Sequence, residues 1–144
     1  MATRLSGILP AALAVALGLS TWAAAQESER LTVEINKFEA ADEGTCRAFF
    51  LFRNDTGQTF EGFELSIAVL DTSGVIDRLL SVDAAPLPVA RTTLKLFEIP
   101  EIGCDAISEL IVHDIPACKP ENAEPMDCYA IVDWISRTRV RLGP

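Results

Sequence analysis

The single histidine of the chain, His113, is the residue that any histidine-dependent proton transfer would have to use. It lies in the stretch VHDIPAC, where Asp114 and Cys118 are close enough in sequence to suggest a metal site. Successive residues of a strand point to opposite faces, however, and a cysteine in an oxidising compartment is usually a disulfide partner. We therefore predict that His113 lies on a sheet face or at a loop edge. We expect no metal site and no cofactor.

Acidic residues cluster in three connections of the chain. Paired carboxylates facing each other across a cleft can hydrolyse glycosidic bonds, and carboxylate oxygens can bind calcium. No cluster has the D-x-D-x-D-G spacing of a calcium loop, and no G-x-S-x-G sequence marks a nucleophilic serine. We interpret the clusters as solvated loop charge and predict no catalytic residue. They comprise Glu39, Asp42 and Glu43; Glu98, Glu101 and Asp105; and Glu121, Glu124 and Asp127.

Arg137, Arg139 and Arg141 alternate within the stretch YAIVDWISRTRVRL, so on a strand all three would face one way. One interpretation is charge that protects an edge strand from pairing with other chains. The other is a docking strip for an acidic partner, since a guanidinium can hold a carboxylate with two hydrogen bonds. Both interpretations use the same geometry, and these arginines are the candidate partner-binding residues.

The chain begins with the features of a cleavable secretory signal. Arg4 precedes an apolar run from Ile8 to Leu19, and the small residues Ala23–Ala25 follow. This pattern predicts a signal peptide over residues 1–25, with cleavage before Gln26 and a mature domain over 26–144. A transmembrane anchor is the alternative, but the run is shorter than the ~20 residues that span a bilayer. We expect a periplasmic protein.

The mature part is one acidic domain. It holds all 21 acidic residues and all basic residues except Arg4, so its net charge is more negative than the −9 of the whole chain. Such a charge gives no general attraction for nucleic acid or anionic lipid. No later run of residues is long and apolar enough to be a transmembrane segment.

Alternating apolar residues predict strands along the whole mature part, with turn sequences NDTG at 54–57 and DTSG at 71–74. In the stretch from Thr92 to Ile99 we expect Leu94 and Leu96 to point inward. Seven short strands with regular turns predict an all-β, immunoglobulin-like antiparallel two-sheet sandwich, with a small barrel as the alternative. The predicted strands are 31–35, 46–53, 60–69, 75–82, 92–99, 107–115 and 129–142.

Residues 49–76, FFLFRNDTGQTFEGFELSIAVLDTSGVI, resemble FxLYD-type domains, which are immunoglobulin-like modules of exported bacterial proteins. The shared features are a turn centred on Asn54, an alternating strand ending at Asp71, and a turn containing Gly74. Ile67 and Leu70 replace the signature aromatic residues. The resemblance implies an immunoglobulin-like scaffold and brings no catalytic or binding residue with it.

The four cysteines, Cys46, Cys104, Cys118 and Cys128, form an even set in a chain predicted to be exported, which indicates two disulfides. No C-x-x-C occurs, so the close spacing of a redox pair or a zinc knuckle is missing. If the strands alternate in direction, Cys46 and Cys104 lie at one end of the sandwich and the other two lie at the opposite end. A seven-residue strand is ~23 Å long. Disulfide Cα atoms lie within roughly 7 Å, so we predict the pairs Cys46–Cys104 and Cys118–Cys128.

These patterns favour a non-enzymatic accessory or protein-interaction module of the cell envelope, whose partner is an unidentified envelope protein. Binding would use loop ends or strand addition at a sheet edge, with the arginines as first candidates. The alternative is a periplasmic protein that binds a small ligand or a metal through the carboxylate loops and His113. A third hypothesis is a hydrolase with paired acids, which would need a concave pocket with converging titratable groups.

Overall fold

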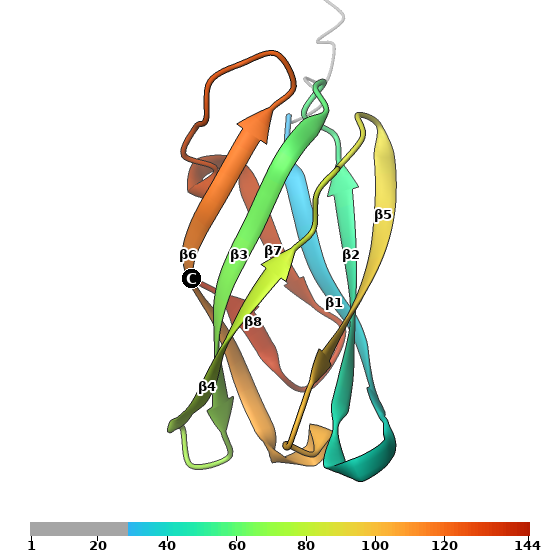
Figure 1. Cartoon of the computed structure of the whole chain (residues 1–144), viewed down its shortest axis with the longest axis vertical. Helices are drawn as coiled ribbons and strands as arrows, with labels where there is room; N and C mark the ends of the chain where they lie inside the picture. Colours follow the sequence, from blue (N-terminus) through green and yellow to red (C-terminus); the bar gives the residue numbers. More distant parts are fainter. Residues whose placement is uncertain (1–28) are drawn as a thin grey trace, which may run out of the picture.

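The computed structural model describes residues 29–144, and the predicted signal peptide lies outside them. Two four-stranded sheets pack face to face (Figure 1), which confirms the predicted two-sheet sandwich. Sheet A has the order β5 (Arg91–Ile99), β2 (Cys46–Asn54), β1 (Leu31–Ala40) and β7 (Val132–Ser136). Sheet B has the order β4 (Ile76–Asp83), β3 (Phe60–Asp71), β6 (Ile107–Pro120) and β8 (Arg141–Gly143). Short 3₁₀ turns occur at η1 (Asp42–Gly44), η2 (Cys104–Ala106) and η3 (Tyr129–Ile131).

The core is formed by alternate side chains of the two inner faces. Phe50 and Phe52 of β2 are at most 2% exposed, as are Phe60 and Phe63 of β3. The Phe52 and Phe63 rings meet edge to face with their centroids 6.1 Å apart, and this contact joins the two sheets. Burial of each such ring stabilises the fold by roughly 1.5–3 kcal/mol, so the aromatic run of β2 makes it a central strand.

The prediction that Leu94 and Leu96 point inward is wrong. They lie opposite Leu51 and Phe49 of β2 on the outer face of sheet A, where Leu94 is 59% and Leu96 is 46% exposed. The inner face of β5 instead carries partly buried Phe97 and buried Ile99. Because side chains alternate with a period of two, this shift of one residue exchanges the side chains of β5 that face the core with those that face solvent.

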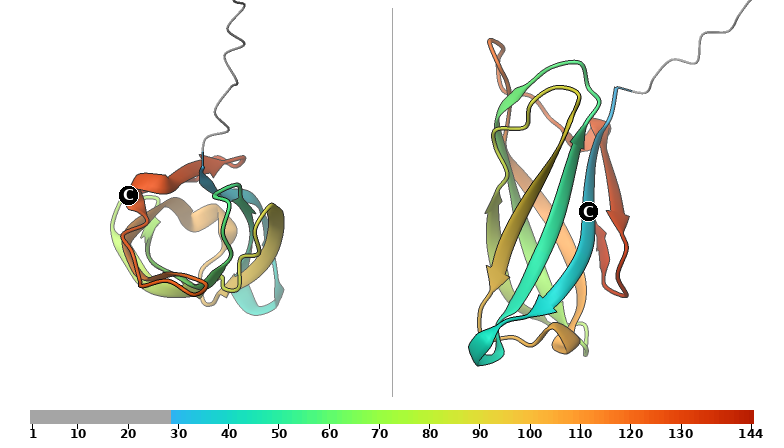
Figure 2. Two further views of the ribbon diagram at one scale, coloured as in Figure 1. Left: turned by 90° about the horizontal axis from the view of Figure 1, so that it is seen from above. Right: turned by 90° about the vertical axis from the view of Figure 1, so that its right-hand side faces the viewer.

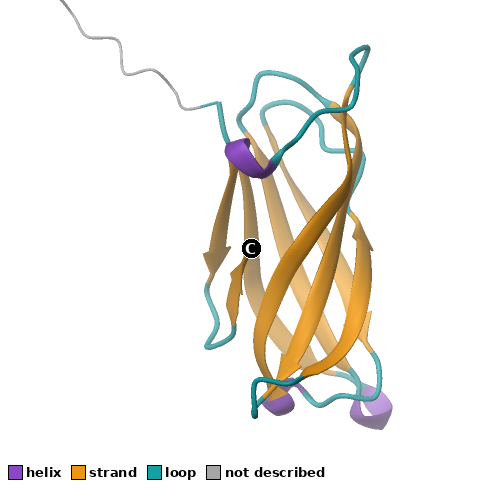
Figure 3. Cartoon of the chain, turned by 90° about the vertical axis from the view of Figure 1, so that its left-hand side faces the viewer, coloured by secondary structure: helices purple, strands orange, loops and turns teal. Residues whose placement is uncertain are grey.

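The last predicted strand, 129–142, is also wrong in its extent. It is broken into β7 and β8, which are joined by a bend over residues 137–140 and lie in different sheets (Figure 3). β7 pairs in parallel with β1, and β8 pairs in parallel with β6, whereas the other strand pairs are antiparallel. The fold therefore has eight strands, and the C-terminal segment passes from one sheet to the other.

The predicted disulfide pairing is confirmed. Cys46–Cys104 joins the start of β2 to η2, with the Cα atoms 4.8 Å apart. Cys118–Cys128 joins β6 to the residue before η3, with the Cα atoms 6.1 Å apart. These segments lie at opposite ends of the long axis (Figure 1), so one covalent link closes each end of the sandwich.

A buried polar cluster ends β2. Asn54 is fully buried, and its Nδ2 donates to the carbonyl oxygens of Gln58 at 2.8 Å and Leu87 at 2.9 Å. Its Oδ1 accepts from the backbone N–H of Thr56 at 3.1 Å and from the Thr56 hydroxyl at 2.7 Å. The side chain therefore holds the turn after β2 against the loop before β5.

Within residues 29–144, no helix combines the length and the apolar character needed to cross a membrane.

Candidate functional site

The bend between β7 and β8 presents two of the candidate arginines, Arg137 and Arg139. Hydroxyl groups hold its backbone: Ser136 Oγ accepts from the N–H of Thr138 at 3.2 Å, and Thr138 Oγ1 accepts from the N–H of Val140 at 3.1 Å. The N–H of Arg137 donates to the carbonyl of Ile35 on β1 at 2.8 Å. These bonds fix the bend, so the arginine side chains start from a rigid backbone.

The three candidate arginines do not form one strip, because the strand that would align them is interrupted. Arg137 and Arg139 lie in the bend, and Arg141 begins β8. All three side chains remain more than half exposed, at 62%, 56% and 78%. The structure thus brings Arg137 and Arg139 to one short segment and leaves Arg141 on the edge of sheet B.

Each of these arginines contacts an acidic residue of its own chain. Arg137 Nε lies 3.3 Å from Glu34 Oε2. Arg139 donates to Asp105 Oδ1 at 3.3 Å and to the carbonyl of Cys104 at 3.0 Å. The Asp105 side chain is fully exposed, so water screens this pair and it contributes little to stability. Asp105 can therefore be displaced from Arg139 by another carboxylate at low energetic cost.

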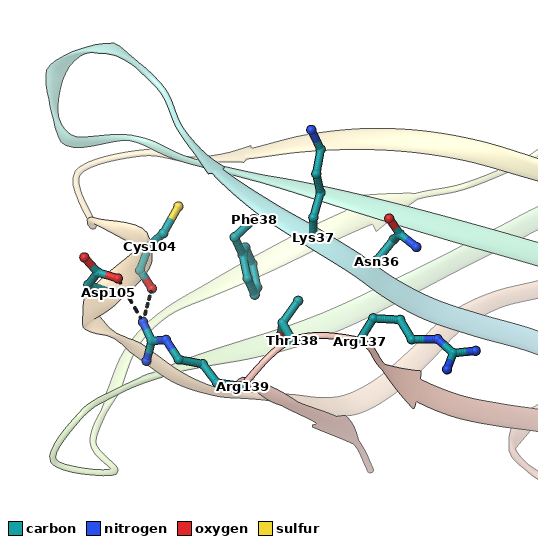
Figure 4. Close-up of a pocket in the computed structure, with 8 residues that line it drawn as sticks. All are labelled: Asn36, Lys37, Phe38, Cys104, Asp105, Arg137, Thr138 and Arg139. Carbon is teal, nitrogen blue, oxygen red and sulfur yellow. Dashed lines mark hydrogen bonds and ion pairs between the residues drawn. The ribbon is translucent and has the colours of Figure 1, made fainter.

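A shallow cleft of about 330 Å³ lies beside the bend. In Figure 4 the guanidinium of Arg139 turns toward Asp105 and Cys104, whereas that of Arg137 extends in the opposite direction. Partly buried Phe38 supplies an apolar wall between them. The cleft is lined by Asn36, Lys37, Phe38, Cys104, Asp105, Arg137, Thr138 and Arg139.

Glu34 of β1 is the ion-pair partner of Arg137, one of the residues that line the cleft. Its side chain points to the outer face of β1 but is only 6% exposed, and it accepts a hydrogen bond from Asn36 Nδ2 at 3.0 Å. This hydrogen bond is the largest cause that lowers the pKa of Glu34 below its ordinary value of 4.5, and the positive charges of Arg137 and Arg53 lower it further against the effect of burial. Glu34 therefore stays ionised and holds Arg137 in place.

The lowered pKa of Glu34 predicts a pH dependence of stability. A group whose pKa is lower in the folded state stabilises the fold above its unfolded value, here 4.5, and this contribution is lost as pH falls through the folded value. Below pH 4.5 we therefore expect the wild type to lose more stability than Glu34→Gln, measured by urea denaturation across a pH series. Glu101→Gln, at a side chain 88% exposed, is the control. Equal acid sensitivity of Glu34→Gln and wild type would contradict the assignment.

His113 is exposed on β6, as predicted for a sheet-face histidine. Its Nε2 lies 2.7 Å from the hydroxyl oxygen of Ser66 on β3, a contact that the sequence did not suggest because strand pairing brings the two residues together. Within residues 29–144 no carboxylate is hydrogen-bonded to His113, and the Asp114 carboxylate accepts from the neighbouring N–H of Ile115. Cys118 forms a disulfide with Cys128, so its sulfur is not available as a metal ligand beside His113 and Asp114.

The acidic clusters are partly neutralised by arginine. Arg47 bridges Glu39 at 3.3 Å and Glu98 at 3.1 Å, which links β1 to β5 across β2. In the part of the chain that the structure describes, no group of three or more histidine, cysteine or acidic side chains could hold a metal ion. These carboxylates serve as ion-pair partners on the surface.

Comparison with known proteins identifies a similar fold and no family. No family model matches the sequence, and no curated protein matches it. A solved structure of IrmA from Escherichia coli is similar, with a TM-score of 0.56 and 12% sequence identity over 73% of this chain and 90% of that chain. At this identity the likeness concerns the fold alone, and this chain shares its β architecture with IrmA.

Proposed function

We propose that the protein is a non-enzymatic interaction module of the cell envelope that binds a carboxylate-bearing partner protein at the bend between β7 and β8. The observation that carries this proposal is the pair of exposed guanidinium groups, Arg137 and Arg139, on a fixed backbone beside a cleft. They form a basic site on a chain whose net charge is −9. Such a site attracts an acidic partner and disfavours others.

The two arginines have different parts in this proposal. Arg137 is held by the buried, ionised Glu34, so it keeps its position when a partner binds. Arg139 is free to exchange fully exposed Asp105 for a carboxylate of the partner, because that pair is screened by water. An apolar side chain next to the partner's carboxylate would pack on Phe38. A guanidinium holds a carboxylate with two parallel hydrogen bonds, which gives orientation as well as affinity.

The envelope assignment is supported by the two disulfides, since such bonds persist in oxidising compartments outside the cytoplasm. The predicted signal peptide supports export to the periplasm. The FxLYD-type resemblance and the absence of enzymatic activity stay predictions.

A second candidate function is binding of a small anionic ligand in the same cleft. Its volume of about 330 Å³ is at the lower end of the roughly 300–1,000 Å³ of small-molecule sites. Calorimetric titration with a small dicarboxylate such as succinate separates the two. Saturable heat with succinate that is lost in Arg139→Glu would favour the small ligand, and a flat titration would favour the protein partner.

The proposed partner site is tested by charge reversal at Arg139. Proteins captured by the wild type from native envelope extracts would be purified, and their affinity for Arg139→Glu measured. We expect affinity to fall by about tenfold or more and the salt dependence to weaken, because one desolvated charge pair becomes a repulsion. Arg141→Glu is the matched control, since Arg141 is equally a surface arginine but lies outside the cleft. Unchanged affinity of Arg139→Glu would exclude the bend as the binding site.

A further inference from the structure

The basic residues that lack a carboxylate partner are gathered at one edge of sheet A. Eleven lysines and arginines lie within residues 29–144. Eight of them form ion pairs with acidic residues of the chain. The three without an ion pair in this part of the chain are Arg53 at the end of β2, and Arg91 and Lys95 of β5. Register places Thr92 of β5 opposite Arg53, so Arg53 and Arg91 lie at one end of this edge, and Lys95 lies further along β5, opposite Phe50.

Exposed apolar side chains lie on the outer face of the same strand, β5. Leu94 and Leu96 are 59% and 46% exposed on the outer face of β5. They pair with Leu51 and Phe49 of β2, which are partly buried on the same face. The four side chains form an apolar patch on the outer face of sheet A, whereas Lys95 lies opposite Phe50 and points to the other face. Leaving large apolar side chains clustered on a surface is unfavourable, and such patches mark interaction sites.

β5 is also the free edge of sheet A. It is the first strand in the sheet order, and no other strand within residues 29–144 is hydrogen-bonded along its outer side. The right-hand view of Figure 2 shows it in gold at one margin of the sheet, with β7 at the other. An edge strand presents alternating unpaired N–H and C=O groups, which are a template for another strand.

From these three features we propose that β5 accepts an extended segment of another protein as a fifth strand of sheet A, and that this segment carries an acidic residue between two apolar ones. Opposed residues of neighbouring strands point to the same face, so the positions opposite Leu94 and Leu96 place their side chains on the outer apolar patch. The position between them lies opposite Lys95 and points to the other face. A carboxylate there meets the ammonium of Lys95, which donates one hydrogen bond to the carbonyl of Ala85 at 3.2 Å and keeps two further N–H donors for a carboxylate.

The charges select against a second copy of this chain as the occupant of this edge and against β4 as the edge that an acidic segment would choose. A second copy of this chain, aligned to put Leu94 opposite Leu96, would place Lys95 directly opposite Lys95 of the copy, and like charges in this position are destabilising. The other edge strand on this side of the sandwich, β4, exposes Ile76 and Leu79 to a similar extent. Its cation Arg78 is already bound by Asp77 and by the carbonyl of Pro100, so β4 has no charge to offer an acidic segment.

The test uses the purified protein and two synthetic peptides, acetyl-Ser-Thr-Val-Glu-Val-Thr-Ser-amide and its counterpart with lysine in place of glutamate. Binding is followed by the amide shifts of the isotopically labelled protein. We expect saturable shifts in β5 and β2 with the glutamate peptide and binding weaker by about tenfold with the lysine peptide. Lys95→Glu should reverse this preference. Leu94→Ser should abolish binding, whereas Leu79→Ser on β4 should retain it.

Three results would overturn the inference: no shifts in β5 at about 5 mM peptide, shifts centred on β4, or a concentration-dependent dimer of this chain that Leu94→Ser dissolves. The inference depends on the proposed interaction role but uses the opposite edge of sheet A from the bend, so the two fail separately. Arg139→Glu should bind the glutamate peptide as the wild type does. Loss of peptide binding in Arg139→Glu would also count against β5.

Discussion

Replacing both Cys46 and Cys104 by alanine is expected to lower the free energy of unfolding by about 4 kcal/mol. The two cysteines are 58 residues apart, and an open loop of this length greatly increases the conformational entropy of the unfolded chain. Since single domains are typically stable by only roughly 5–15 kcal/mol, the loss is a large part of the total. Equilibrium denaturation in urea, followed by the fluorescence of Trp134 in β7, measures it.

The double variant of the other disulfide, Cys118→Ala with Cys128→Ala, is the matched comparison. Its cysteines are only 10 residues apart, so the same entropy argument gives a smaller loss of about 3 kcal/mol. Each double variant removes the covalent link at one end of the sandwich. The length of the loop that the disulfide closes is the difference that the comparison tests. A larger loss for the short loop than for the long one would contradict the entropic explanation.

Asn54→Ala is expected to destabilise the fold by about 3 kcal/mol: four hydrogen bonds worth roughly 1 kcal/mol each are lost at a fully buried position, and the donors that two of the partners keep offset part of this loss. In the variant the carbonyl of Gln58 still accepts from the Thr56 hydroxyl, and the carbonyl of Leu87 still accepts from the N–H of Phe60. The N–H of Thr56, in contrast, loses its acceptor. Thermal denaturation and urea titration of the purified variant give the loss.

Two neighbouring variants show whether the Asn54 side chain itself is responsible. Thr56→Val keeps the shape and removes the hydroxyl, so it should cost about 1 kcal/mol. Asp55→Ala, at the exposed residue between them, should change stability by less than about 0.5 kcal/mol. A loss for Asn54→Ala no greater than that for Asp55→Ala would show that the cluster is not a structural anchor.

The strands and disulfides were predictable because they depend on short-range pattern and on one topological argument. The aromatic run from Phe49 to Phe52 marks β2 as a central strand, and the turns after β2 and β3 carry residues that favour reversals. With strand direction alternating along the chain, only one cysteine pairing avoids crossing the length of the sandwich. The structure has that pairing.

The orientation of β5 could not be predicted, because the stretch TTLKLFEI carries apolar residues on both faces. Leu94 and Leu96 compete with Phe97 and Ile99, and in an edge strand neither face needs to be fully covered. Alternation alone does not decide such a case, since one residue of slip exchanges the two faces. The binding edge proposed for β5 follows from this inversion and is therefore visible only in three dimensions.

The sequence singled out the arginines of the candidate site but did not indicate how they are arranged. The alternation of Arg137, Arg139 and Arg141 is typical of a strand, yet the hydroxyl oxygens of Ser136 and Thr138 accept hydrogen bonds from backbone N–H groups and turn the backbone between the arginines. Hydroxyl side chains that bond to nearby backbone groups compete with sheet pairing, and here residues 137–140 form a bend and not a strand. The ion pairs with Glu34 and Asp105 join residues far apart in the chain, and no local pattern signals such contacts.

The parallel pairing of β1 with β7 has a consequence for folding during synthesis. Leu31 lies beside Val132, so the first strand of the domain can pair with β7 only after residues 32–131 have been made. Contacts between residues this distant in sequence form slowly. The pairing of β1 with β7 cannot form at all while residues 132–136 are still inside the ribosome. While residues 132–136 are still in the ribosome, the backbone groups along one side of β1 therefore have no strand to pair with.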